Sequence, residues 1–189
     1  MDFLSLVKKN RSYRRFKQDH RLNMKTLREL VNLARLSGSS SNLQGLKFFL
    51  SVDSEMNSRI FKYLKWAYYL KNWDGPAEGE RPGGYIIILG DTEIHSTIDT
   101  DVGIAAQSIL LGAAEKGLGG CMIGSVDRPG LRKELNIKEQ YQIPLVIALG
   151  KPDEKIVLDK VEDTGNIQYW RDENDVHHVP KRSLDDIII

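Results

Sequence analysis

The spacing of apolar residues predicts several amphipathic helices. Residues 24–36 carry apolar side chains at intervals of three and four, with charged residues between them, which is the period of a helix that buries one face. Residues 100–116 show the same period, and Gly103 and Gly112 would let another helix approach closely. Asp2 is a candidate N-cap for a short first helix. The same criteria predict further helices over residues 2–9, 54–73 and 128–135.

Short apolar runs predict the strands. Residues 85–89, YIIIL, form a continuous apolar run bounded by glycines, which is typical of a central strand buried on both faces. Residues 119–126 are a strand or a turn. Segments 37–45 and 74–84 are rich in Gly, Ser, Pro and polar residues, which indicates loops. Further strands are predicted over residues 46–52 and 141–150.

The last 39 residues differ in character from the rest of the chain. Residues 151–189 are polar and charged, with little periodicity before the final SLDDIII. A segment of this kind rarely folds on itself, so we expect an extended arm that lies over the body of the protein or over a partner subunit. At 189 residues and 41% hydrophobic content, we expect residues 1–189 to form one domain with its own core.

The charge balance counts against a protein that binds bulk polyanions. Lys and Arg total 27 against 26 Asp and Glu, a formal net charge of +1, whereas a nucleic-acid-binding domain usually has a clear basic excess. The longest uncharged run, residues 102–114, is too short to cross a bilayer. We therefore expect neither a nucleic-acid partner nor a membrane.

Cysteine usage and the first residues bear on the compartment. One cysteine allows neither a disulfide framework nor a zinc site of ordinary spacing. The opening MDFLSLVKKNR has an acid at its second position and lacks the apolar core of a signal peptide. A reducing, cytoplasmic location is expected.

The stretch Asn10–Phe16, NRSYRRF, is the first candidate for chemistry. Arg11, Ser12 and Arg14 could converge on a phosphate, because arginine offers a planar fork of donors and serine adds a hydroxyl group. A solvated basic turn is the alternative. A nucleic-acid-binding arm is weakened by the near-neutral net charge. The stretch alone leaves these alternatives open.

Two segments rich in glycine or serine are further candidates. The loop SGSSSNLQG, residues 37–45, is either a plain connection or a binding loop whose Asn42 and Gln44 suit the edge of a planar heterocycle. In GLGGCMIGS, residues 117–125, the glycines follow a helix and precede a strand, the reverse of the dinucleotide-binding order. They form either a helix C-cap or backbone that lies flat against a ring. Cys121 is expected to be a small buried thiol.

The segment HHVPKR, residues 177–182, carries two histidines and two cations close together. It is either a solvated tail or a pair of cations that reach an anion. Adjacent histidines point in different directions on most backbones, so no metal site is expected here.

Together these stretches resemble the nitroreductase family of FMN-dependent oxidoreductases. RSYRRF (11–16) is similar to the family's R-S-x-R-x-F motif, and SGSSSNLQGLKFF is similar to its Asn/Gln-containing loop. DVGIAAQSILLGAAEKGLGGCMIG, followed by LVIALGKP, resembles its central helix, glycine turn and closing strand, and VPKRSL resembles a common family C-terminus. The resemblance implies an α+β fold with a mostly antiparallel central sheet flanked by helices. It also implies a homodimer in which a C-terminal arm extends onto the partner.

The resemblance implies a flavin site shared between two subunits. The first motif would hold the phosphate, ribityl chain and pyrimidine edge of FMN, and loop 37–45 would meet the same flavin from the partner. The glycine turn would lie beside the isoalloxazine ring, and a cation near the C-terminus would complete the phosphate clamp. The implied cofactor-binding residues are Arg11, Ser12, Arg14, Ser39, Ser40, Asn42, Gln44, Ile123, Gly124, Lys181 and Arg182.

The implied chemistry belongs to the cofactor, so no catalytic side chain is expected. A fixed guanidinium would stabilise negative charge on the reduced ring. By resemblance, electrons pass from NADH or NADPH through FMN to a small acceptor, such as a nitroaromatic or quinone, in a ping-pong mechanism. The aromatics of residues 66–83 would lie near the mouth of the site, and helix 100–116 would form the dimer core. Alternatives are a non-catalytic flavin-storage protein and a different flavin reaction, such as dehalogenation or flavin breakdown.

Overall fold

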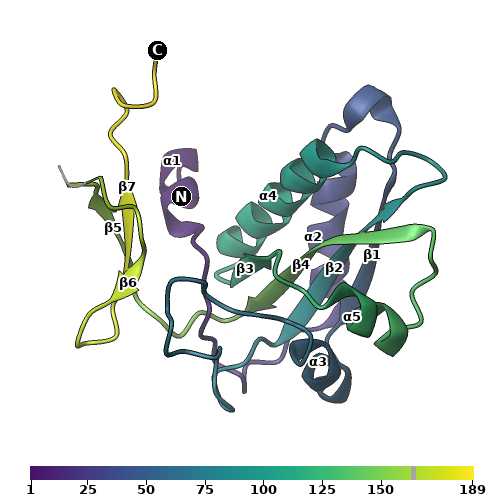
Figure 1. The fold of residues 1–189 in the computed structure, drawn as a ribbon, viewed down its shortest axis with the longest axis horizontal. Coiled ribbons are helices and arrows are strands. Elements are labelled where there is room, and N and C mark those ends of the chain that lie inside the picture. Colours follow the sequence, from purple (N-terminus) through teal and green to yellow (C-terminus); the bar gives the residue numbers. More distant parts are fainter. Residues whose placement is uncertain (163–164) are drawn as a thin grey trace.

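A four-stranded antiparallel sheet between two layers of helices forms the body of this computed structural model, which describes residues 1–162 and 165–189 (Figure 1). Its order is β1-β2-β4-β3. The fold class predicted from the sequence is confirmed in its mixed composition and its antiparallel sheet. The strands are β1 (Leu46–Ser51), β2 (Gly84–Asp91), β3 (Gly119–Ile123) and β4 (Tyr141–Gly150).

The central strand β2 explains why the body has two hydrophobic cores. Every residue of β2 is buried, as its apolar run predicted. Ile86 and Ile88 face one core, with helices α2 (Met24–Leu36) and α4 (Asp99–Glu115). Tyr85 and Ile87 face the other core, on the opposite side of the sheet, with α3 (Ser54–Phe61) and α5 (Arg128–Glu134). Burying each isoleucine contributes about 1.5–3 kcal/mol, so β2 anchors both layers.

Local capping sets the start of the first helices. The Asp2 side chain accepts a hydrogen bond from the Ser5 amide at 3.0 Å, which begins α1 (Phe3–Lys9) and confirms the predicted N-cap. Asn23 does the same for α2 through the Thr26 amide at 2.9 Å. Both helices therefore begin where a short polar side chain can satisfy a free amide.

A close contact between α2 and α4 confirms one predicted role for glycine. A Cβ atom on Gly112 would lie 2.2 Å from Leu33 Cδ1, so glycine lets the two helices pack at this distance without displacing the Leu33 side chain. Gly103, the other glycine of α4, is exposed, and no atom lies within 4 Å of where its Cβ would be.

The predicted helix over residues 54–73 is wrong in its second half. Helix α3 ends at Phe61, and the chain then turns so that Leu64 forms a β-bridge with Val126. Trp66 is buried, and a Cβ on Gly75 would come within 2.6 Å of its ring. Tertiary burial of these aromatic side chains thus overrides a pattern that is locally compatible with a helix.

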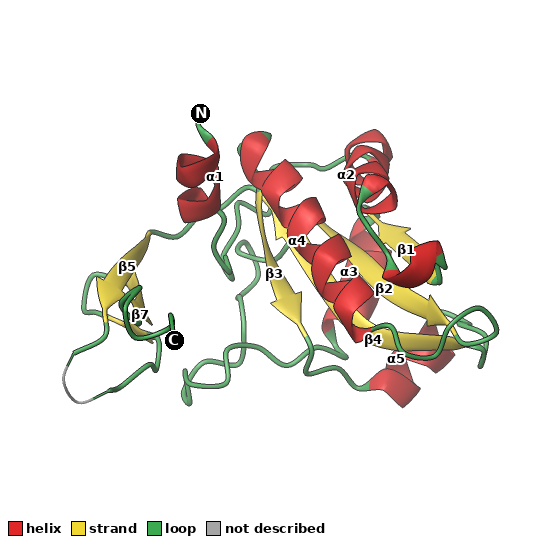
Figure 2. Cartoon of the chain, turned by 90° about the horizontal axis from the view of Figure 1, so that it is seen from above, coloured by secondary structure: helices red, strands yellow, loops and turns green. Residues whose placement is uncertain are grey.

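The C-terminal segment also differs from the prediction, because it folds on itself. Strands β5 (Ile156–Lys160) and β7 (His177–Lys181) pair in parallel, and β6 (Trp170–Arg171) pairs antiparallel with β7. This small sheet lies on the α1 side of the molecule, apart from the main sheet (Figures 1 and 2). The strands are two to five residues long, too short for periodicity to reveal them. Within the described residues, no helix combines the length and apolar character needed to span a bilayer.

Candidate functional site

The NRSYRRF stretch lies against the edge strand β3. Ser12 forms a parallel β-bridge with Gly120, and the Tyr13 amide donates to the Gly120 carbonyl at 3.0 Å. A Cβ on Gly119 would lie 2.4 Å from the Tyr13 ring. The glycine turn is therefore needed so that the arginine-bearing segment can approach the sheet this closely.

A cavity of about 300 Å³ opens beside this segment. It gathers four of the predicted residues, three from the first motif and one from β7, although they lie at opposite ends of the chain. Among the described residues, no carboxylate lines it. The lining consists of Asn10, Arg11, Ser12, Arg14, Gln107, Leu110, Met122, Tyr169, His177, Val179 and Lys181.

Arg14 is held by contacts on several sides. Its side-chain NH1 group donates to the Ser12 carbonyl at 3.2 Å and lies 3.3 Å from His177 Nε2. Its guanidinium carbon lies 4.6 Å from the centre of the Tyr169 ring, a cation–π geometry. The Arg14 backbone amide donates to Glu154. Only 9% of Arg14 is exposed, so its charge is fixed beside the cavity.

His177 is a cavity residue whose role the sequence did not reveal. It is fully buried, and burial lowers its pKa to about 4, with the nearby charges of Arg14 and Arg171 acting in the same direction. The ring is therefore neutral at pH 7. Arginine can only donate, so Nε2 accepts and the proton resides on Nδ1. This buried Nδ1 has no acceptor among the described residues.

A buried ion pair supports the same region from behind. Arg171 NH2 lies 3.1 Å from Glu154 Oε2, with side-chain exposures of 9% and 2%. Arg171 also lies over the Trp73 ring at 4.5 Å, and burial lowers its pKa. Glu154 accepts from the backbone amides of both Arg14 and Arg15, so the pair ties the first motif to the C-terminal sheet. Removing one partner would leave a buried charge uncompensated.

Of the other predicted residues, Arg11 and Lys181 line this cavity, whereas Arg182 and Ile123 do not. Arg11 donates from NH2 to the Val7 carbonyl at 2.8 Å, while its buried Nε has no acceptor among the described residues. Lys181 lines the cavity, whereas the exposed Arg182 is not among the lining residues. Ile123 points into the core, and the neighbouring Met122 lines the cavity instead.

Gly124, the other predicted residue of the turn, is exposed and lies outside the cavity lining. Its carbonyl accepts from Arg128 NH2 at 3.0 Å. No atom lies within 4 Å of where its Cβ would be, so the space beside it is open.

The second predicted group lies elsewhere on the same chain. Ser39 and Gln44 line a separate cavity of about 200 Å³ together with Asp101. The Ser40 amide donates to Asp101 Oδ1 at 2.9 Å, and Asp101 is 2% exposed. Asn42 is exposed in the adjoining 3₁₀ turn. Within one chain, the structure does not bring this group to the first cavity, because the two linings share no residue.

The backbone of this loop is strained. Ser41, Asn42 and Gln44 have φ angles of 48°, 56° and 54°, in the left-handed region that residues other than glycine seldom adopt. Such strain costs on the order of 1–3 kcal/mol per residue and tends to persist where structure serves binding.

Aromatic side chains from residues 66–83 reach the first cavity indirectly. The Tyr69 ring packs edge-on against Tyr169 at 5.0 Å, and Tyr169 lines the cavity. Cys121 is buried, and burial raises the pKa of its thiol, which confirms the prediction of a buried thiol. His178 turns away from His177 and lies 2.8 Å from Asp159, so the two histidines do not share a ligand. No cluster of potential metal ligands occurs in residues 1–162 and 165–189.

Comparisons with known proteins bear on the family of this chain. The profile of the Nitroreductase family matches residues 7–151. MhqN of Bacillus subtilis (strain 168), named as an NAD(P)H nitroreductase, is 20% identical over 191 residues, covering 79% of this chain and 88% of MhqN.

Two solved structures have a similar fold. An FMN-dependent nitroreductase from Clostridium difficile R20291 gives a TM-score of 0.67 at 26% identity, covering 81% of this chain and 89% of that one. The NADPH:FMN oxidoreductase of Vibrio harveyi, complexed with NAD⁺, gives a TM-score of 0.62 at 23% identity. This match covers 80% of this chain and 69% of the Vibrio chain. Because the profile spans most of the sequence and the fold agrees, the chain belongs to the nitroreductase family.

Proposed function

We propose that the protein is an FMN-dependent oxidoreductase that passes electrons from NADH or NADPH to a small acceptor such as a nitroaromatic or a quinone. The observation that carries this proposal is the cavity that gathers Arg11, Ser12, Arg14 and Lys181. Family membership supports an oxidoreductase. The Clostridium protein is named for FMN, and MhqN and the Vibrio enzyme are named for NAD(P)H and NADPH, which supports these two cofactors.

The cavity suits the phosphate end of FMN in its charge. The cations Arg11, Arg14 and Lys181 line it, and His177 is neutral. Among the residues that the structure describes, no carboxylate lines it. Two buried donors, Arg11 Nε and His177 Nδ1, lack acceptors among the described residues, and a buried donor without an acceptor costs about 1–3 kcal/mol. An anionic, oxygen-rich ligand would satisfy both the charges and the donors.

The chain's own residues would bind and orient the cofactor. Arg11, Ser12 and Lys181 would bind the phosphate and ribityl chain, with Lys181 rather than Arg182 as the C-terminal cation. Arg14, fixed by His177 and Tyr169, would present a positive charge to the pyrimidine edge. When bound, FMN supplies the hydride and electron transfer. The aromatic side chains of Tyr69 and Tyr169 would limit water and shape the mouth of the site.

A homodimer would complete this site. At about 300 Å³, the cavity is at the small end of ligand pockets, so one chain leaves much of a flavin uncovered. The strained loop carrying Ser39, Ser40, Asn42 and Gln44 would approach from the partner. Helix α4 exposes Gly103 and Ile104, and this face is the proposed dimer core. The C-terminal sheet and the tail beyond it would form the arm that contacts the partner.

Anaerobic titration tests the proposal. We expect the purified protein to be yellow, to bleach with NADH or NADPH, and to regain its colour with a nitroaromatic or a quinone. Parallel lines in double-reciprocal plots would support ping-pong kinetics. A bound flavin that stays oxidised with both nucleotides would instead indicate a storage protein, and a colourless protein that takes up no FMN would contradict the flavin site itself.

A further inference from the structure

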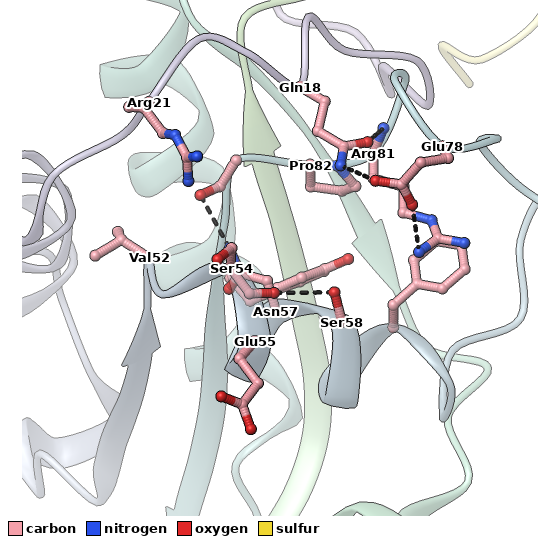
Figure 3. A pocket seen from close by; sticks show the side chains of 13 residues that line it. Gln18, Arg21, Val52, Ser54, Glu55, Asn57, Ser58, Glu78, Arg81 and Pro82 are labelled. Carbon is pink, nitrogen blue, oxygen red and sulfur yellow. Dashed lines mark hydrogen bonds and ion pairs between the residues drawn. The ribbon is translucent and has the colours of Figure 1, made fainter.

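Figure 3 shows a second cavity, of about 290 Å³. It is enclosed by residues 18–21, the first turns of α3, the 78–83 loop and the start of β2, and it shares no lining residue with the first cavity. Nothing in the proposed oxidoreductase chemistry uses it. Its lining consists of Gln18, Arg21, Val52, Ser54, Glu55, Asn57, Ser58, Phe61, Glu78, Arg81, Pro82, Gly83 and Tyr85.

Tyr85 provides a buried donor at this cavity. It is 1% exposed, and its hydroxyl group forms no hydrogen bond with any described residue, yet the side chain lines the cavity. Burial raises its pKa strongly, with the charge of Arg81 opposing the shift, so the hydroxyl stays protonated at neutral pH. Because Tyr85 lines the cavity and its hydroxyl group has no partner among the described residues, this group is free to donate to a ligand there. A ligand that offers an acceptor would therefore find a donor in place.

Arg81 provides a second donor, and its position is fixed. Its guanidinium carbon lies 4.4 Å from the centre of the Phe61 ring, and its NH1 group pairs with Glu78 at 2.9 Å. Gln18 Oε1 accepts from the Arg81 backbone amide at 3.0 Å, which holds the loop in place. The buried Nε of Arg81 has no acceptor within residues 1–162 and 165–189.

The charges around the cavity favour a singly charged anion. Figure 3 shows the Arg21 guanidinium directed toward the cavity and the Glu55 carboxylate directed away from it. Glu78 is already engaged by Arg81 and Gln18. Arg81 and Glu78 neutralise each other, which leaves Arg21 as the lining cation without an ion-pair partner among the described residues. One unpaired cation suits a monoanion better than a phosphate dianion.

The apolar part of the lining indicates that the anion is an organic molecule. Val52, Phe61 and Pro82 contribute apolar surface beside the polar groups. We propose that this cavity binds a small organic monocarboxylate, with its oxygens accepting from Tyr85 and Arg81, its charge facing Arg21, and its apolar part against Phe61 and Pro82. The site is independent of the proposed flavin chemistry, because it is built from different residues.

Calorimetric titration of the full-length protein with benzoate tests this proposal, with benzamide as the uncharged analogue of the same shape. We expect benzoate to bind and benzamide to bind at least tenfold more weakly. Tyr85→Phe removes only the hydroxyl and should weaken benzoate about tenfold, and Arg81→Lys and Arg21→Gln should each weaken it by a similar factor. Tyr141→Phe and Arg28→Gln, which change the same groups outside this cavity, should leave the affinity unchanged.

Three results would overturn the proposal. The first is no benzoate binding, and the second is equal binding of benzoate and benzamide. The third is benzoate affinity that survives Tyr85→Phe and Arg81→Lys while the absorbance of bound flavin changes, because that would place benzoate at the other cavity. Melting temperatures of all variants show that a lost affinity is not a lost fold.

Discussion

Arg14 shows how the fold fixes a single residue of the candidate site. Its guanidinium contacts Ser12, His177 and Tyr169, and its backbone amide is held by Glu154. Arg15, its neighbour, points elsewhere and pairs with Glu80 at 3.4 Å and Asp175 at 3.2 Å. Adjacent arginines therefore have different tasks, which the sequence stretch alone left open.

Replacing Arg14 with alanine should give a colourless and less stable protein. The change removes the fixed cation and leaves His177 Nε2 without its donor, which we expect to cost about 1–3 kcal/mol in the free energy of unfolding. Visible absorbance after purification and urea unfolding measure the two effects. Arg28→Ala on the exposed face of α2 is the control. Retention of full flavin by Arg14→Ala would remove Arg14 from the site.

The buried imidazole of His177 predicts a pH dependence of stability. Its pKa is depressed from an ordinary 6.5 to about 4, so in this range the unfolded state binds more protons than the folded one. The contribution of His177 to the free energy of unfolding is present above pH 6.5. It is lost as the pH falls toward 4, by on the order of 3 kcal/mol in total. Urea unfolding between these pH values should therefore show a shallower loss for His177→Gln than for the natural chain. Identical slopes would contradict a neutral, buried His177.

At the scale of elements, the placement of the first motif depends on the edge of the main sheet. Gly119 and Gly120 of β3 let Tyr13 and Ser12 lie directly against the strand. The pairing joins residues more than a hundred positions apart, so no local sequence pattern predicts it. Elements with a clear local pattern were predicted within two residues of their bounds; these are α1, α2, α4, α5, β1, β2 and β4.

Gly119→Ala should disrupt this contact. A Cβ would lie 2.4 Å from the Tyr13 ring and 2.7 Å from Pro152, so the motif has to shift, at a cost of about 1–3 kcal/mol. Flavin content should fall together with stability. Gly38→Ala is a matched control for stability, because no atom lies within 4 Å of its added Cβ. If both variants behave like the natural chain, the close approach of Tyr13 to β3 is not needed.

The whole molecule leaves large apolar side chains uncovered. Phe3 and Leu4 of α1, Ile104 of α4 and the final isoleucines are exposed to between 38% and 124% of their reference areas. Other exposed apolar side chains lie on α2, β3 and β5, so the apolar surface extends over several elements. Large exposed apolar areas are typical of interaction surfaces. This distribution supports the proposed homodimer, in which the loop that carries Asn42 would reach the partner's cavity.

Ile104→Glu tests the assembly directly. A charge at the centre of the proposed interface should shift the protein toward the monomer in sedimentation velocity, because it would be buried without a partner. Flavin content should fall with the loss of the partner's loop. Met24→Glu replaces a similarly exposed apolar side chain on α2 and is the control. A dimer that survives Ile104→Glu with full flavin would place the interface elsewhere.

The sequence by itself determined the features that depend on local periodicity and on short motifs. These are the helices 24–36 and 100–116, the buried strand around 85–89, the antiparallel fold class, and the cations that now lie around one cavity. Their predicted role as flavin ligands stays a prediction.

Only the tertiary structure decided the features that depend on distant pairing and burial. The C-terminal sheet joins short strands across about 20 residues, and residues 62–73 leave the helix because Trp66 packs into the core. His177 and Tyr169 enter the cavity through that sheet, and Met122 rather than Ile123 faces it. Each of these features depends on which side chains become buried when segments far apart in the sequence come together. The local sequence does not contain that information.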